Sequence, residues 1–202
     1  MTSPADPDPP LPGLRERKKA RTLAAIQTEA LRLFREHGYE ATTVDEIAAA
    51  AEVSPSTFFR YFPTKEDVVV RDLYDPLVFE VFKAQPAEMG PIQALRSALR
   101  LVWDELTPEQ LASERERQEL IYANPELRAR MMDEVAVTIK LFIELIAERA
   151  GRSPDDLEVR IFTGALTGIF LSLMLTAPDA SQNELIAQIE AGLVWLEPRL
   201  EL

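Results

Sequence analysis

The chain has 202 residues, 47% of them hydrophobic, which is enough for one or two domains with a buried core. It contains no cysteine, so disulfides and thiolate metal sites are excluded and a reducing compartment fits. The formal net charge of −12 argues against a nucleic-acid partner only if the charge is spread evenly. However, residues 15–65 hold nine Lys/Arg against seven Asp/Glu, whereas residues 73–202 hold twelve against twenty-two. The N-terminal quarter therefore stays compatible with DNA binding.

Residues 1–14 are predicted to be a disordered arm, because five prolines fall between positions 4 and 12. A basic cluster then opens a long helix that is expected to end at Gly38. Arg17 and Lys18 of this cluster are candidate DNA contacts, with a solvated helix start as the alternative. The single histidine, His37, has no second histidine or cysteine to join it in a metal site, so we expect a capping or packing role.

Two short helices joined by a tight turn are predicted next. Thr43 and Glu46 fit a capping box, so the first short helix begins directly after Thr43. Ser54 followed by Pro55 is an N-cap and first-turn pair, and it begins the second short helix. This is the geometry by which a helix-turn-helix protein places one helix in the DNA major groove.

The second short helix has two different faces. Phe58 and Phe62 are four residues apart and are assigned to the core. Phe59 and Arg60 lie on the opposite face, where a ring can meet a thymine methyl and a guanidinium can bond to guanine. The alternative is an ordinary aromatic core beside a solvated Arg60. The other predicted DNA contacts, most of which would hold phosphates and fix register, are Thr42, Thr43, Pro55, Ser56, Thr57, Tyr61 and Lys65.

Residues 17–69 resemble the N-terminal DNA-binding domain of the TetR family of bacterial repressors. The matching segments are LFREHGY at 33–39, ATTVDEIA at 41–48, VSPSTFFRYF at 53–62 and TKEDV at 64–68. The resemblance implies a homodimeric regulator, usually a repressor, that binds a palindromic operator in double-stranded DNA and is released by a small molecule.

The family usually has glycine in the inter-helix turn, where this chain has Glu52. Glutamate tolerates a positive φ less well than glycine, so we expect a slightly different path for the turn. This departure is the main support for an alternative reading, a helical adaptor that has lost DNA binding.

The predicted fold class is all-α. A three-helix helix-turn-helix domain would cover residues 15–65, and a helical ligand-binding and dimerisation domain would cover residues 66–202. A linking helix is expected from Lys65 to Lys83, with a kink at Asp75-Pro76. Proline and glycine boundaries predict further helices at 91–106, 108–123, 125–150, 154–176 and 182–198.

The resemblance also implies a small-molecule pocket in the C-terminal domain. Its candidate lining, for which plain core packing is the alternative, comprises Phe79, Phe82, Leu99, Trp103, Ile121, Phe142, Phe162, Leu166 and Phe170. The stretch from Glu114 to Arg128 is similar to a TetR subgroup described as binding acyl-coenzyme-A-like ligands. The phosphates of such a ligand would meet arginines, with Arg96, Arg100, Arg128 and Arg130 as candidates. The acidic character of this domain argues against a polyanion and leaves an apolar or cationic effector open.

Residues 157–176 are apolar nearly all round, which predicts a helix buried on every side. In the TetR family the last two long helices form a four-helix dimer interface, and core helices of a monomer are the alternative. The implied interface residues are Gly164, Gly168, Leu171, Leu185, Ile189 and Leu193.

No catalytic machinery is evident. One histidine, no cysteine, no glycine-rich phosphate loop and no G-x-S-x-G predict that the protein is not an enzyme and needs no cofactor or metal. We expect no apolar run of about 18 residues, the length of a membrane span, and the N-terminus does not have the pattern of a signal peptide. The predicted location is therefore the cytoplasm, in association with the nucleoid and without a membrane partner.

Overall fold

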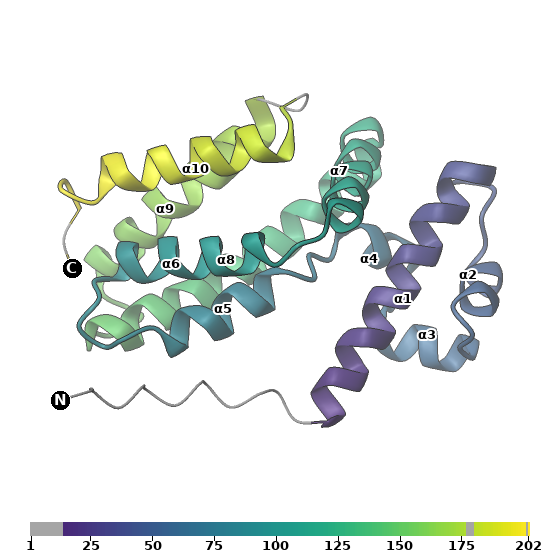
Figure 1. Cartoon of the computed structure of the whole chain (residues 1–202), viewed down its shortest axis with the longest axis horizontal. Helices are drawn as coiled ribbons and strands as arrows, with labels where there is room; N and C mark the ends of the chain where they lie inside the picture. Colours follow the sequence, from purple (N-terminus) through teal and green to yellow (C-terminus); the bar gives the residue numbers. More distant parts are fainter. Residues whose placement is uncertain (1–13, 177–179, 201) are drawn as a thin grey trace, which may run out of the picture.

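The computed structural model describes residues 14–176, 180–200 and 202. Within these residues the chain forms ten α-helices and no strand, which confirms the all-α fold class (Figure 1). The predicted arm lies outside the described residues, except for Leu14, which begins the first helix.

Four helices make up the N-terminal part: α1 (Leu14–His37), α2 (Val44–Ala50), α3 (Pro55–Tyr61) and α4 (Lys65–Val70). The first ends as expected at Gly38, which has a φ of +89°. These helices share a buried cluster, here called the N-terminal core. Its largest fully buried side chains come from all four helices and from α8: Ile26, Ile47, Phe58, Phe62, Val68, Val69 and Leu127.

The prediction of one linking helix is wrong, because this segment forms two helices. α4 ends at Val70, and α5 (Asp75–Ala84) begins after a four-residue joint. The side chain of Asp72 accepts hydrogen bonds from the backbone N–H groups of Tyr74 (2.7 Å) and Asp75 (3.2 Å), which starts a new helix. The proline at position 76 falls in the first turn of α5, where its missing N–H costs nothing.

The C-terminal part comprises α6 (Pro91–Asp104), α7 (Pro108–Ala123), α8 (Pro125–Ala150), α9 (Leu157–Thr176) and α10 (Gln182–Leu196). The ends predicted for α7 and α8 are confirmed, because side chains of Thr107 and Asn124 cap their starts and Gly151 (φ +63°) stops α8. A second buried cluster, the C-terminal core, joins α5, α6, α8, α9 and α10.

Helix α8 belongs to both cores. Its first turns supply Leu127 and Met131 to the N-terminal core, and its second half supplies Phe142 and Ile146 to the C-terminal core. Helices α1 to α3 lie at one end of the molecule and α9 and α10 at the other, with α8 running between them (Figure 1). One continuous helix thus links the two ends.

Candidate nucleic-acid interface

Local capping sets the helix-turn-helix. Thr43 and Glu46 form the predicted capping box: the Thr43 N–H donates to the Glu46 carboxylate at 2.8 Å, and the Glu46 N–H donates to the Thr43 hydroxyl at 3.3 Å. At α3 the Thr57 N–H donates to the Ser54 hydroxyl at 3.1 Å, and Pro55 occupies the first helical position. Both helix starts are therefore determined by residues within four positions of them.

The turn between α2 and α3 adopts the conformation that glycine favours. Glu52 has a φ of +53°, in the left-handed region, and is the non-glycine residue with positive φ in the described chain. The Val53 N–H reaches the Ala48 carbonyl at 2.9 Å and closes the turn. The glutamate therefore adopts the positive φ that glycine favours.

Helix α3 separates its aromatic rings as predicted. Phe58 and Phe62 are fully buried in the N-terminal core, whereas Phe59 is 51% exposed. The Phe59 ring meets the edge of Phe58, with 5.5 Å between centroids, so a buried ring orients an exposed one. Beside it the exposed Arg60 guanidinium lies 4.8 Å from the Tyr61 ring centroid. Among the described residues, Arg60 has no carboxylate or carbonyl partner, so its five N–H donors face solvent.

A group of hydroxyls lies at the start of the same helix. The Ser54 hydroxyl is 2.9 Å from the hydroxyls of both Ser56 and Thr57. Ser56 and Pro55 are exposed and Thr57 is half-buried. This group borders the Phe59–Arg60 face and presents donors of the kind that hold a phosphate backbone.

Two predicted DNA contacts are engaged inside the protein instead. Thr42 is 1% exposed, and its hydroxyl donates to the carbonyls of Gly38 (2.9 Å) and Leu33 (3.3 Å). The ammonium of Lys65 donates to the carbonyls of Tyr39 (2.9 Å) and Thr42 (3.3 Å) and lies 4.3 Å from the Tyr39 ring centroid. Burial and these backbone partners make both residues supports of the α1–α2 loop, which corrects their assignment to DNA contact.

The remaining candidates differ in exposure. Thr43 is exposed, but its hydroxyl donates to Glu46 in the capping box at 2.8 Å. Lys18 is exposed on the first turns of α1, while the side chain of Arg17 lies outside the described residues. DNA contact by Lys18 and by the Phe59–Arg60 face of α3 remains a prediction.

Known proteins match both halves of the chain. Residues 26–71 match the profile of the bacterial regulatory proteins of the tetR family, and residues 89–201 match the MftR C-terminal domain. The second match covers more than half of the chain. The chain belongs to the TetR family.

Its relatives include regulators from several bacteria. It is 36% identical to the HTH-type transcriptional regulator TcmR of Streptomyces glaucescens over 72% of this chain and 67% of that protein. It is 30% identical to the regulator EthR of Mycolicibacterium smegmatis over 86% of this chain and 83% of that protein. It is also 27% identical to the putative mycofactocin biosynthesis regulator MftR of Mycobacterium tuberculosis over 77% and 79%.

Among solved structures, the TetR-family repressor FadR of Thermus thermophilus, in complex with lauroyl-CoA, has a TM-score of 0.53 and 26% identity. The alignment covers 89% of this chain and 95% of that one. The protein is therefore a transcriptional regulator with the TetR-family architecture, a helix-turn-helix domain followed by a helical domain.

In this TetR-family chain, most residues predicted to line an effector pocket are core residues. Phe82, Leu99, Phe142, Phe162 and Leu166 are at most 6% exposed in the C-terminal core. Phe79, Trp103 and Phe170 pack against that core and are partly buried. Ile121 belongs to the N-terminal core, so its assignment to the same pocket is wrong.

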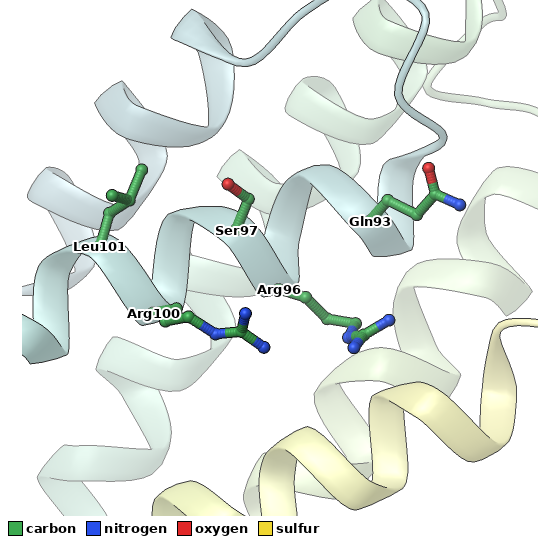
Figure 2. Close-up of a pocket in the computed structure, with 5 residues that line it drawn as sticks. All are labelled: Gln93, Arg96, Ser97, Arg100 and Leu101. Atoms are coloured by element: carbon green, nitrogen blue, oxygen red, sulfur yellow. The ribbon is translucent and has the colours of Figure 1, made fainter.

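A pocket beside α6 is lined mostly by polar side chains. It has a volume of about 240 Å³ and is lined along α6 by Gln93, Arg96, Ser97, Arg100 and Leu101 (Figure 2). Both arginines point toward α10. There Arg96 pairs with Glu190 at 2.7 Å and Glu197 at 2.6 Å, and Arg100 pairs with Glu190 at 2.9 Å.

The arginines proposed for ligand phosphates thus have partners within the chain. Arg128 donates to the Tyr122 carbonyl, and Arg130 pairs with the buried Asp67 at 2.8 Å. Carboxylates and carbonyls of the chain therefore already bind the guanidinium groups that were predicted to bind ligand phosphates. These arginines no longer support the prediction of an acyl-coenzyme-A-like ligand.

The residues predicted for a dimer interface divide into two groups. Leu193 (0% exposed) and Ile189 (9% exposed) belong to the C-terminal core and are not available to a partner, whereas Leu171 and Leu185 are half-buried. Gly164 and Gly168 are exposed, and a Cβ at either position would meet nothing within 4 Å. The close approach of α9 to α10 occurs instead at Gly192, where a Cβ would lie 3.0 Å from the Ile169 side chain.

Helix α9 also corrects the expectation about apolar runs. By length and composition it is sufficient to cross a membrane, and only 22% of its apolar window is buried within the chain. The prediction that it is buried on every side is therefore wrong for the single chain. Its inner face, with Val159, Phe162 and Leu166, packs in the C-terminal core.

A group of buried charges at the α4–α5 joint was not predicted from the sequence. Arg117 and Glu114 of α7 are 5% and 7% exposed, and they lie beside Asp72 of the joint. Their three-residue spacing on a helix shows that they can pair. Their burial comes from the packing of α7 on α4, which no local signal reports.

Proposed function

We propose that the protein is a homodimeric repressor that binds a palindromic operator and releases it when a small molecule binds its C-terminal domain. The observation that carries this proposal is the exposed Phe59–Arg60 face of α3, anchored beneath by Phe58 and Phe62. An exposed aromatic ring lowers the solubility of the unbound protein. Beside an arginine that has no internal partner, the same ring can contact base edges in a major groove. In a dimer, two such faces meet successive major grooves one helical turn apart.

The proposed contacts follow from exposure. Arg60 would donate to guanine and Phe59 would meet a thymine methyl. The phosphate backbone would be held by a second set, namely Arg17, Lys18, Thr43, Pro55, Ser56, Thr57 and Tyr61. The acidic C-terminal part would face away from DNA, and binding would weaken steeply with salt.

The dimer is supported by the outer faces of α9 and α10. On α9, positions 157, 161, 164, 168 and 175 form one stripe at helical spacing, and Leu157, Ile161 and Leu175 are 54–70% exposed. On α10, Val194 and Trp195 are 46% and 59% exposed. Apolar stripes of this size on adjacent helices mark a protein interface. A partner copy would cover them in a four-helix arrangement.

One variant tests the dimer. Ile161→Glu places a charge in the centre of the proposed interface, and we expect it to convert the dimer to monomer in light scattering at micromolar concentration. Lys140→Glu, on α8, is the matched control and is expected to leave the mass unchanged. A wild-type protein that is monomeric at these concentrations would remove the dimer from the proposal.

For the effector, an acyl-coenzyme-A-like molecule is the class to test first, because the FadR relative is solved with lauroyl-CoA. The internal pairing of Arg96, Arg128 and Arg130 weighs against a phosphate-bearing ligand. Thermal denaturation with lauroyl-CoA, lauric acid and coenzyme A separately distinguishes these chemistries. Stabilisation by lauric acid alone would select an apolar effector.

We place the boundary between the two domains in the joint at residues 71–74 and not after Lys65. Val68, Val69 and Val70 of α4 pack in the N-terminal core with α1 and α3. Because a DNA-binding regulator acts on the chromosome, we propose a cytoplasmic, nucleoid-associated location. We propose no catalytic activity and no cofactor, since the family acts by binding.

Selection of bound duplexes from a random library, with the full-length protein at two salt concentrations, tests the whole proposal. We expect a palindromic consensus and a steep loss of binding at the higher salt. No enrichment at either salt would favour the helical adaptor. The positive φ of Glu52, in the region that glycine favours, weighs against that alternative.

A further inference from the structure

The end of α4 is held by side chains from other helices. The last carbonyls of a helix have no partner within it and must be satisfied elsewhere. The Gln27 side chain of α1, 8% exposed, donates to the carbonyls of Val68 (2.9 Å) and Arg71 (3.0 Å). This pair of bonds ties α4 to the DNA-binding helices.

Arg117 of α7 holds the same end from the other side. Its guanidinium donates to the carbonyls of Val69 (2.9 Å) and Val70 (3.3 Å). It also donates to one carboxylate oxygen of Asp72 at 3.4 Å, while the other oxygen of Asp72 caps the start of α5. One side chain therefore binds the end of α4 and the beginning of α5 together.

Glu114 orients this arginine. The guanidinium makes a bidentate pair with the Glu114 carboxylate, one bond of which is 2.8 Å long, and Gln118 donates to the same carboxylate at 3.2 Å. A planar, forked guanidinium with two fixed carboxylate contacts has little freedom to rotate. The direction of Arg117, and with it the angle at the joint, is thus set by α7.

The opposite end of α4 is attached to α8. The Asp67 side chain is 3% exposed and accepts from the Thr64 N–H at 3.0 Å, which caps α4. Arg130 of α8 donates to the other oxygen of Asp67 at 2.9 and 2.8 Å. Consequently α4 is held at both ends by arginines from helices that follow the joint.

We propose that Arg117 is a positioning residue for DNA binding: its guanidinium fixes the angle between α4 and α5, and so places α3 relative to the C-terminal core. A shift of α7 by an ångström or two, of the size seen in allosteric helix movements, would be passed through this guanidinium to both helices at once. The inference rests on the proposed ligand-responsive dimer and names the residue through which the response reaches the DNA-binding helices.

The absence of cysteine from the chain allows a direct test. A spin label is attached at Glu40→Cys, an exposed position after α1. Double electron–electron resonance then measures the distance between the two labels, and so between the two DNA-binding domains of the full-length dimer. Arg117→Lys keeps the charge but cannot bridge two carbonyls and two carboxylates. We expect a broader distance distribution and about ten-fold weaker binding to the selected duplex.

Arg149→Lys is the matched control. Arg149 also donates to backbone carbonyls, those of Phe82, Gln85, Pro86 and Met89, but at the end of α5 and in the α5–α6 loop. The variant loses the same type of bond away from the α4–α5 joint. We expect this variant to be less stable but to keep the wild-type distance distribution. Its affinity for DNA, corrected for the fraction of folded protein, should equal that of the wild type.

Asp72→Asn is the second variant, and it decides the question if Arg117→Lys does not fold. Its side-chain oxygen can still cap α5, while its contact with Arg117 is weakened, so we expect a broadened distribution without loss of stability. Unchanged distributions in the folded variants, or equal broadening in Arg149→Lys, would overturn the inference. If the labelled wild-type protein gives no distance between subunits, the proposed dimer is wrong. Two labels within one chain, at Glu40→Cys and Ser153→Cys, then test the role of the joint separately.

Discussion

The arginines of α3 and of the C-terminal helices differ in what they contact. Arg60 on α3 projects into solvent beside an exposed phenylalanine, and no acceptor within the described residues meets it. In contrast, Arg96, Arg117 and Arg149 each bind two or more carboxylates or carbonyls of their own chain. Arg60 therefore keeps donors available for an external partner, whereas the donors of Arg96, Arg117 and Arg149 are already used within the chain.

The largest expected difference is between two neighbouring phenylalanines. Phe58→Ala removes a fully buried ring and should lower the free energy of unfolding by about 3–5 kcal/mol. Phe59→Ala removes a half-exposed ring and should cost about 1 kcal/mol or less, while weakening DNA binding. Urea denaturation of both variants measures this difference. Equal losses of stability would show that Phe59 is a core residue.

Arg60→Ala is next in size. We expect a loss of about 1–3 kcal/mol in specific DNA binding and relaxed preference at one base pair, with little change in stability. Lys65→Met is the contrasting variant: because its ammonium binds the carbonyls of Tyr39 and Thr42, it should lower stability and leave base preference intact. Fluorescence anisotropy with the selected duplex and its single-base variants checks both, and unchanged operator affinity in Arg60→Ala would contradict the assignment.

A smaller effect is expected from pH. Burial, and secondarily the nearby carboxylate of Asp72, raise the pKa of Asp75 to about 7, while Thr138 and Arg117 oppose this and Glu114 adds to it. The folded chain therefore keeps a proton that the unfolded chain loses above its ordinary pKa near 4. Stability should fall as pH rises between about 4 and 7.

Asp75→Asn removes this dependence. At pH 8 its Tm should exceed that of the wild type by several degrees, because each kcal/mol changes the Tm of a chain of this size by roughly 2–4 °C. At about pH 4 the two proteins should differ least, because Asp75 is then protonated in the folded chain and partly protonated in the unfolded chain. Glu114, where burial also raises the pKa against the attraction of Arg117, stays in both proteins and is the internal control. A Tm difference that is the same at both pH values would contradict the assigned proton.

The smallest effect concerns the turn. Glu52→Asn should stabilise the chain by about 1 kcal/mol or less, because asparagine adopts a positive φ more readily than glutamate. Glu52→Gln removes the same charge without this backbone preference and should leave stability unchanged. Urea midpoints separate the two variants, and equal gains would assign the effect to charge.

Local sequence alone accounts for the starts of α2 and of α3, the helix proposed to bind DNA. Thr43, Ser54 and Pro55 act on backbone groups within one turn of themselves, so the limits of α2 and α3 follow from neighbouring residues alone. The separation of Phe58 from Phe59 also follows from helical spacing.

The charged groups of Lys65, Arg117 and Arg130 are instead placed by the packing of helices that are distant in the sequence. Each binds a carbonyl or carboxylate that lies 23 to 63 residues away in the chain. Such partners are chosen by which helices pack together, because a buried guanidinium or ammonium must meet acceptors in the fold and not in the sequence. For the same reason Thr42 and Ile121, which local pattern assigned to DNA and to a ligand, lie within the N-terminal core.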